Sequence, residues 1–121
     1  MTDVAHPHHG IDYIEFTVTD MTAAQEFYGS VFGWKFTQYG PDYAGIQGPE
    51  PGREVGGFSR QAEGSTGGPL IVLYSQDLEA TLAAVRGAGA SIVTEPFEFP
   101  GGRRFHFQDP SGNELAVWSE S

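Results

Sequence analysis

The sequence of 121 residues contains no cysteine, which excludes disulfide bonds and thiolate metal sites. Basic residues are also few: Lys35 and five arginines stand against 16 acidic residues, which gives a formal net charge of −10. This charge argues against binding to nucleic acid or to anionic membrane surfaces. No apolar run approaches the roughly 20 residues of a transmembrane helix, and the first residues lack a signal-peptide pattern. We therefore expect a soluble cytoplasmic protein.

The proportions of hydrophobic and charged residues, 39% and 18%, are those of a globular chain. We predict a flexible leader at residues 1–10 and one domain at residues 11–121, because chain ends are usually loose. The leader contains His6, His8 and His9. These histidines could bind a metal weakly, but a loose chain end is the simpler interpretation.

A β-hairpin is predicted near the end of the chain, where two alternating runs flank Asp-Pro-Ser-Gly-Asn at residues 109–113. If the hairpin closes symmetrically, Phe107 lies opposite Leu115 and His106 lies opposite Ala116. Because successive strand side chains point to opposite faces, one face must be buried. That face consists of Phe105, Phe107, Leu115 and Val117. The other face carries Arg104, His106, Gln108, Glu114, Ala116 and Trp118.

The first half of the chain is predicted to form strands at residues 11–19, 34–39, 43–47 and 55–60. Asp20 is suited to cap a helix at 21–32, and Gly33 is suited to end it. Gly56 and Gly57 suggest a close approach of backbone or ligand to the last strand, although a purely structural need explains them equally well. The apolar stripe of the helix is expected to lie in the core: Met21, Ala24, Phe27, Tyr28, Val31 and Phe32.

The second half repeats this order, with Asp77 at a helix cap 57 positions after Asp20. The helix is expected to end at residues 87–89, and the segment 96–102, which contains Phe97 and Phe99, is expected to be a loop. Strands are predicted at residues 70–74 and 91–94, followed by the hairpin. The chain therefore contains the pattern β-α-β-β-β twice.

Short βαβββ units cannot each bury a sheet face alone, so we expect them to pair. The predicted fold is α+β: modules at about 11–60 and 69–119 form a curled mixed sheet with helices on its convex side and a cleft on its concave side. The side chains expected in this cleft are Tyr13, Glu15, Thr17, Leu70, Val72, Tyr74, His106, Glu114, Ala116 and Trp118. Exposure to solvent poorly explains so many apolar and aromatic residues, which favours a ligand cavity or a partner surface.

These residues resemble the glyoxalase/bleomycin-resistance/extradiol-dioxygenase superfamily, whose fold is called vicinal oxygen chelate. The segments that carry the resemblance are Tyr13–Asp20, Phe27-Tyr28, Phe32-Gly33-Trp34, Asp77–Thr81 and Asp109–Asn113. The resemblance implies paired βαβββ modules around a cleft that often holds a divalent metal. It also implies a homodimer, since small members of this superfamily usually associate.

The sequence departs from the superfamily at the metal ligands, which are typically His and Glu. The resemblance places three ligand positions at Tyr13, Leu70 and Ala116, and the fourth lies within residues 55–60, which contain no His, Asp or Glu. Leucine and alanine cannot coordinate a metal, and a neutral phenol is a poor ligand for a hard divalent ion. We therefore expect no metal and no other cofactor.

Two functions of different classes remain. The first is a metal-free binding protein that sequesters an aromatic or largely apolar small molecule, with the predicted ligand-binding residues Tyr13, Glu15, Leu70, Val72, Tyr74, His106, Ala116 and Trp118. The second is an enzyme that uses His106 with Glu15 or Glu114 as general acid and base, because an imidazole near a carboxylate can titrate near neutrality. A displaced metal site formed by His106, Glu15 and Glu114 is a third, weaker hypothesis.

Overall fold

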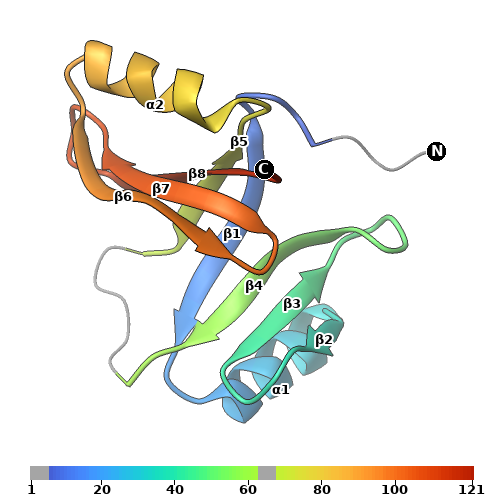
Figure 1. The fold of residues 1–121 in the computed structure, drawn as a ribbon. Coiled ribbons are helices and arrows are strands. Elements are labelled where there is room, and N and C mark those ends of the chain that lie inside the picture. Colours follow the sequence, from blue (N-terminus) through green and yellow to red (C-terminus); the bar gives the residue numbers. More distant parts are fainter. Residues whose placement is uncertain (1–5, 63–67) are drawn as a thin grey trace. The chain divides into compact units, whose positions relative to one another are not determined.

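The computed structural model describes residues 6–62 and 68–121, which belong to two compact units. The first unit is Tyr13–Pro69, and the second unit combines Met1–Asp12 with Leu70–Ser121. Within the described residues, each unit contains one helix and a mixed sheet (Figure 1). The predicted α+β class and the repeated βαβββ order are therefore confirmed. The predicted cleft draws residues from both units and stays a prediction.

The first unit takes most of its sheet from one continuous stretch of chain. Its elements are β1 (Ile11–Val18, of which Ile11 and Asp12 belong to the second unit), α1 (Met21–Phe32), β2 (Phe36–Gln38), β3 (Tyr43–Gln47) and β4 (Glu54–Arg60). The strands lie in the order β2-β3-β4-β1. The pair β1–β4 is parallel, and the other two pairs are antiparallel.

Helix α1 has the bounds that its capping residues predict. The Asp20 side chain accepts a hydrogen bond from the Ala23 N–H at 3.0 Å, and Gly33 ends the helix in the left-handed conformation with φ of 75°. The Trp34 N–H then donates to the Tyr28 carbonyl, which makes Trp34 part of the helix end. The strand predicted at 34–39 is shorter for this reason.

The core of the first unit contains only part of the stripe predicted for α1. Its buried members are Met21, Ala44, Ile46 and Phe58, with Ala24 and Tyr28 packed against them. The core prediction is wrong for three residues of the stripe, since Phe27, Val31 and Phe32 are 53–61% exposed. The reason is geometric, because the apolar stripe is wider around the helix than the side of the helix that packs on the sheet.

The second unit repeats the topology of the first. Its elements are β5 (Leu70–Tyr74), α2 (Leu78–Gly87), β6 (Ser91–Phe99), β7 (Gly102–Gln108) and β8 (Glu114–Ser119). The strands lie in the order β5-β8-β7-β6, and only the pair β5–β8 is parallel. Neither helix within the described ranges is long and apolar enough to cross a membrane.

The C-terminal hairpin has the predicted register and the predicted buried face. Phe107 lies opposite Leu115, and His106 lies opposite Ala116. Phe105 and Val117 are fully buried against Leu78 and Leu82 of α2, and Phe107 packs at the edge of this cluster. Helix α2 therefore covers the face of the sheet that the alternation assigned to the core.

The loop predicted at residues 96–102 is wrong, because β6 continues to Phe99 and pairs Phe97 with Arg104. Pro96 has no N–H for a sheet hydrogen bond, a property that disfavours proline inside a sheet. However, β6 is an edge strand, and its register shifts between Thr94 and Phe97. A bulged edge strand tolerates proline, so the aromatic residues of this segment join the sheet.

Residues 6–10, the described part of the predicted leader, run beside the end of β5. The His9 N–H donates to the Tyr74 carbonyl at 2.6 Å, and the Tyr74 N–H donates to the Gly10 carbonyl at 3.2 Å. Residues 1–5 of the leader lie outside the described residues. His6 to Gly10 thus belong structurally to the second unit.

Replacing Phe105 with alanine should lower the free energy of unfolding by about 3–5 kcal/mol, because the side chain is 0% exposed and leaves a cavity. The matched control is Val93→Ala on β6, where the side chain is 47% exposed and the loss should be below about 1 kcal/mol. Urea unfolding measures both values. Equal losses would mean that the strand register is shifted by one residue.

Candidate functional site

The sheet face of the second unit that points away from α2 collects residues from β5, β8 and β7. Val72 lies beside Ala116, which is opposite His106, and Tyr74 lies beside Trp118, which is opposite Arg104. Alternation adds Leu70, Glu114, Phe97 and Phe99 to the same side. We call this set the helix-free face: Leu70, Val72, Tyr74, Phe97, Phe99, Arg104, His106, Glu114, Ala116 and Trp118. It contains every predicted ligand-binding residue of this unit.

His106 is the polar centre of the helix-free face. Its side chain is 12% exposed, and Nδ1 lies 2.8 Å from the Glu114 Oε2 atom. Because an ionised carboxylate only accepts hydrogen bonds, Nδ1 carries a proton, and Nε2 keeps a lone pair whenever the ring is neutral. The Nε2 atom is buried and has no hydrogen-bond partner among residues 6–62 and 68–121. A buried polar atom in this state is ready to bond with a ligand.

The surroundings of His106 are aromatic and apolar. The Phe97 ring centroid lies 5.9 Å from the His106 ring, and Val72 and Ala116 beside it are 3% and 0% exposed. The Arg104 guanidinium carbon lies 5.6 Å and 5.7 Å from the centroids of Phe97 and Phe99, within the range of cation–π contacts. This arrangement combines apolar contact area with two side chains that can fix orientation.

Trp118 is held by hydrogen bonding and by ring contacts. Its indole N–H donates to Asp12 Oδ2 at 2.9 Å, and the ring contacts His6, Tyr74 and Phe99 at centroid distances of 5.0–6.1 Å. Part of the Trp118 ring, which we predicted to bind a ligand, is therefore covered by other aromatic rings.

Tyr74 is held similarly, since its hydroxyl donates to Glu120 at 2.8 Å. Burial is the largest cause that raises the pKa of Tyr74 to about 12, followed by the hydrogen bond to Glu120 and the negative charges of Glu120 and Asp12. The Tyr74 hydroxyl is thus a committed donor, and its ring supplies mainly apolar area.

His6 and Asp12 were missed by the sequence analysis, which treated His6 as part of a loose leader. His6 Nδ1 lies 2.9 Å from Asp12 Oδ1, and the Asp12 carboxylate is only 3% exposed. A signal was present in the sequence, because Asp12 alternates with Ile14 and Phe16, which point to the core side of β1. An acidic residue on the apolar side of a strand needs a buried partner.

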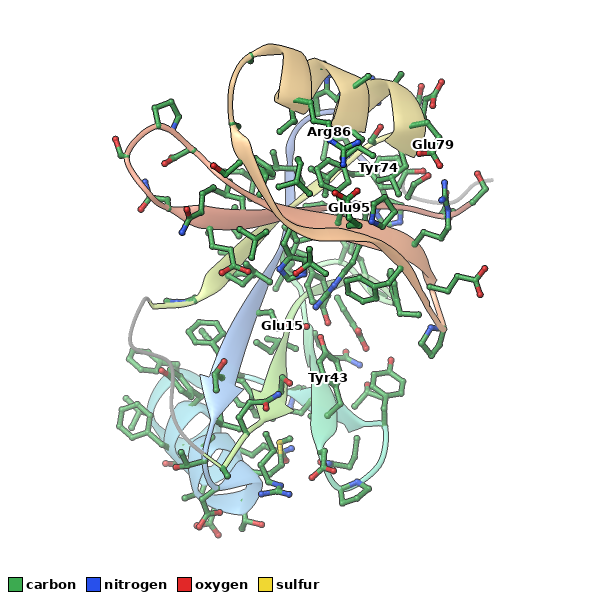
Figure 2. The ribbon with its side chains drawn as sticks, turned by 60° about the vertical axis from the view of Figure 1, so that its left-hand side comes forward. Glu15, Tyr43, Tyr74, Glu79, Arg86 and Glu95 are labelled. Carbon is green, nitrogen blue, oxygen red and sulfur yellow. The ribbon has the colours of Figure 1, made fainter. Side chains whose placement is uncertain are left out.

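Tyr13, Tyr43 and Glu15 form a hydrogen-bonded chain in the first unit. Figure 2 labels two of its members, Tyr43 and Glu15. The Tyr43 hydroxyl donates to Glu15 Oε2 at 3.0 Å, so the 2.6 Å contact between the two hydroxyls requires Tyr13 to donate to Tyr43. Burial is the largest cause that raises the pKa of both phenols, to about 12 for Tyr13. Tyr43 was missed in the sequence because nothing in its own strand marks it.

Gly57 explains how the two hydroxyls reach each other. A Cβ atom at Gly57 would collide with the hydroxyl oxygens of Tyr43 and Tyr13, and one at Gly56 would collide with the Ile14 carbonyl. Of the interpretations of these glycines, the structural need is confirmed: protein atoms approach both positions.

Of the two carboxylates predicted to act with His106, Glu114 lies within hydrogen-bonding distance of it, and the catalytic role of the pair stays a prediction. Glu15 lies in the first unit and accepts from Tyr43, so its pairing with His106 stays a prediction. The displaced metal site finds no support, because no three His, Asp or Glu side chains within the described ranges are arranged to hold an ion.

Comparison with known proteins identifies the family. Residues 10–117 match the family model described as the Glyoxalase/Bleomycin resistance protein/Dioxygenase superfamily. A search of curated protein sequences finds no match.

Several solved structures have the same fold. The Mn(II)-bound glyoxalase from Novosphingobium aromaticivorans shares 26% identity with a TM-score of 0.72, over 93% of this chain and 39% of that chain. Methylmalonyl-CoA epimerase from Mycobacterium tuberculosis shares 16% identity with a TM-score of 0.74, over 99% and 93%. NAD-dependent benzaldehyde dehydrogenase from Legionella pneumophila shares 18% identity with a TM-score of 0.69, over 88% and 96%. The last two similarities concern the fold alone.

The residues at the four implied metal-ligand positions do not fit a metal. The fourth position is now defined as Gly57, because Gly57 pairs with β1 in the first unit as Ala116 pairs with β5 in the second. Gly57, Leu70 and Ala116 offer no donor side chain, and the Tyr13 hydroxyl is committed to Tyr43. No step through a metal is therefore derived for this chain.

The free energy of unfolding should decrease as the pH rises from about 10 to 12. Below the ordinary tyrosine pKa of about 10 both states hold the phenolic protons, but above it the unfolded chain loses protons that folded Tyr13 and Tyr74 retain up to about 12. Tyr13→Phe should make this decrease less steep in urea unfolding at several pH values. Ile46→Val, a core control, should lower all values without changing the slope. An unchanged slope in Tyr13→Phe would contradict the prediction.

Elemental analysis of the purified, untagged protein should find far less than one zinc, nickel, manganese or iron per chain. The reason is the lack of donor atoms at Gly57, Leu70 and Ala116. A variant with His8 and His9 replaced by alanine controls for weak binding by exposed histidines. About one metal per chain in both proteins would refute this expectation.

Proposed function

Because the chain belongs to the glyoxalase/bleomycin resistance protein/dioxygenase superfamily, we propose that it binds an aromatic or largely apolar small molecule without a metal. The observation that carries the proposal is the buried Nε2 atom of His106, which has no hydrogen-bond partner in the described part of the chain. Leaving such an atom unsatisfied costs roughly 1–3 kcal/mol, and a ligand donor would recover that energy.

The helix-free face supplies the other properties of a ligand site. Val72, Ala116 and the ring of Phe97 give apolar contact area around His106, which suits a ligand with an apolar body and one polar group. The polar group must donate a hydrogen bond when His106 is neutral, since Glu114 occupies the protonated nitrogen. The ligand-binding roles predicted for Tyr13 and Glu15, which lie in the first unit, stay predictions from the sequence.

A second candidate function is general acid–base catalysis by His106 and Glu114. The observation that favours it is the 2.8 Å contact between Nδ1 and the carboxylate, which orients the imidazole so that Nε2 can exchange a proton with a bound compound. The two functions differ in the fate of the ligand: a binding protein returns it unchanged, whereas an enzyme converts it. A homodimer and a cytoplasmic location stay predictions from the sequence.

Binding should be found by screening small aromatic compounds for changes in tryptophan emission and in melting temperature. His106→Ala should raise the dissociation constant of a hit about ten-fold or more. This change corresponds to the free energy of one hydrogen bond to a buried group. Val93→Ala, on a neighbouring strand, should leave it unchanged.

Mass spectrometry of each hit after incubation with the protein separates binding from catalysis. An unchanged compound supports the binding function, and a product that disappears with His106→Ala supports the enzyme. Equal affinities of the wild-type protein and His106→Ala for every hit would refute the role of His106.

A further inference from the structure

We propose that His6 and Asp12 form a proton-accepting site at the Tyr74–Trp118 end of the helix-free face, and that this site takes the hydroxyl of a phenol-type ligand. The inference rests on the proposed function, because it assigns a chemical class to a ligand bound on that face. It adds residues outside the predicted ligand set and gives a role to the N-terminal segment.

The Asp12 carboxylate determines which ring nitrogen of His6 points a proton toward it. It is 3% exposed and receives two donors at 2.9 Å: Nδ1 of His6 at Oδ1 and the indole N–H of Trp118 at Oδ2. Since the ionised carboxylate only accepts, Nδ1 of His6 carries a proton, and Nε2 keeps its lone pair whenever the ring is neutral. Asp12 thereby fixes the tautomer in which His6 is a base.

The His6 ring packs on the aromatic residues at one end of the helix-free face. The ring lies 4.9 Å from Tyr74 at an interplanar angle of 30° and 5.0 Å from Trp118 at 81°. The side chain is 31% exposed, and its Nε2 atom makes no hydrogen bond within residues 6–62 and 68–121. Aromatic surface and an accepting nitrogen therefore occur side by side.

Charge selects the class of ligand. An anion beside a neutral His6 would meet the carboxylates of Asp12 and Glu120 in a chain with a net charge of −10. A neutral phenol avoids that repulsion and can donate its hydroxyl proton to Nε2. If transfer is complete, the O–H bond breaks, an N–H bond forms, and the resulting imidazolium is stabilised by Asp12 beside the phenolate.

The His6 side chain is not required to hold the segment that carries it. Residues 7–10 are fixed by the backbone bonds from His9 to Tyr74, from Tyr74 to Gly10 and from Gly10 to Pro7. His8 also accepts a hydrogen bond from the Gln76 N–H at 2.9 Å. The His6–Asp12 pair is thus available for a role other than anchoring.

The test uses the full-length protein with 4-nitrophenol, whose phenolate absorbs visible light that the neutral form does not, and with 4-nitroanisole, which lacks the hydroxyl. Near the pKa of the free phenol, the wild-type protein should bind 4-nitrophenol and increase the phenolate absorbance. His6→Ala should bind it about ten-fold more weakly without that increase. Asp12→Asn should retain weaker binding with less phenolate. 4-Nitroanisole should bind wild type and His6→Ala equally.

His9→Ala is the matched control, since His9 belongs to the same segment but lies against Thr81 of α2. It should bind 4-nitrophenol like the wild-type protein. The proposal is overturned if the wild-type protein does not bind 4-nitrophenol, if His6→Ala binds and ionises it equally well, or if His9→Ala loses as much as His6→Ala.

His106→Ala distinguishes this inference from the proposed function. If only His106→Ala weakens binding, the ligand face stands and the role of His6 fails. If only His6→Ala weakens it, the His6 site stands and the role assigned to His106 fails. If both variants weaken binding, both assignments are supported, and if neither does, both are refuted.

Discussion

The register between β7 and β8 is the constraint on which the second unit depends. Pairing Phe105 with Val117 places both side chains under α2, and the same pairing places His106 beside Ala116 on the opposite face. A shift of one residue would turn His106 toward the core and Phe105 toward solvent. Burial of the apolar face thus determines where the ionisable side chains lie, because one alternation serves both faces.

Carboxylates determine what these polar side chains can do. Glu114 holds Nδ1 of His106, Asp12 holds Nδ1 of His6, and Glu15 accepts from Tyr43. In each case the carboxylate accepts the hydrogen bond that its neighbour donates. The neighbour, when neutral, then keeps a lone pair that can accept a hydrogen bond. The surfaces that result accept hydrogen bonds, which favours ligands that carry donors over ligands that carry anions.

The elements that were predicted correctly have strong local signals. Asp20 and Gly33 define α1 by capping, and the turn at residues 109–113 defines the hairpin with its register. These signals act between residues close in sequence, so the sequence contains them directly.

The errors and omissions depend on tertiary context. The segment that begins at Pro96 was predicted to be a loop, but the sheet order shows that β6 is an edge strand, which tolerates proline. Phe27 and Phe32 fit the apolar period of the helix, but only the packed structure shows that the sheet leaves their side chains exposed. His6 and Trp118 are 112 positions apart and meet through Asp12, a contact that no local pattern predicts.

The polar chain of the first unit bears on the loss of the metal ligands. Gly57 leaves room above β4, and the hydroxyls of Tyr13 and Tyr43 occupy that room in a hydrogen-bonded chain that ends at Glu15. Replacing Gly57 with a residue that has a side chain would require these hydroxyls to move, so the glycine and the tyrosines depend on each other. Gly57 stands at a position where the resemblance implies a metal ligand, and in this chain it provides the space that the two hydroxyls occupy. Restoring a single ligand would therefore not restore a metal site, because Leu70 and Ala116 would still lack donors and the Tyr13 hydroxyl would still be committed to Tyr43.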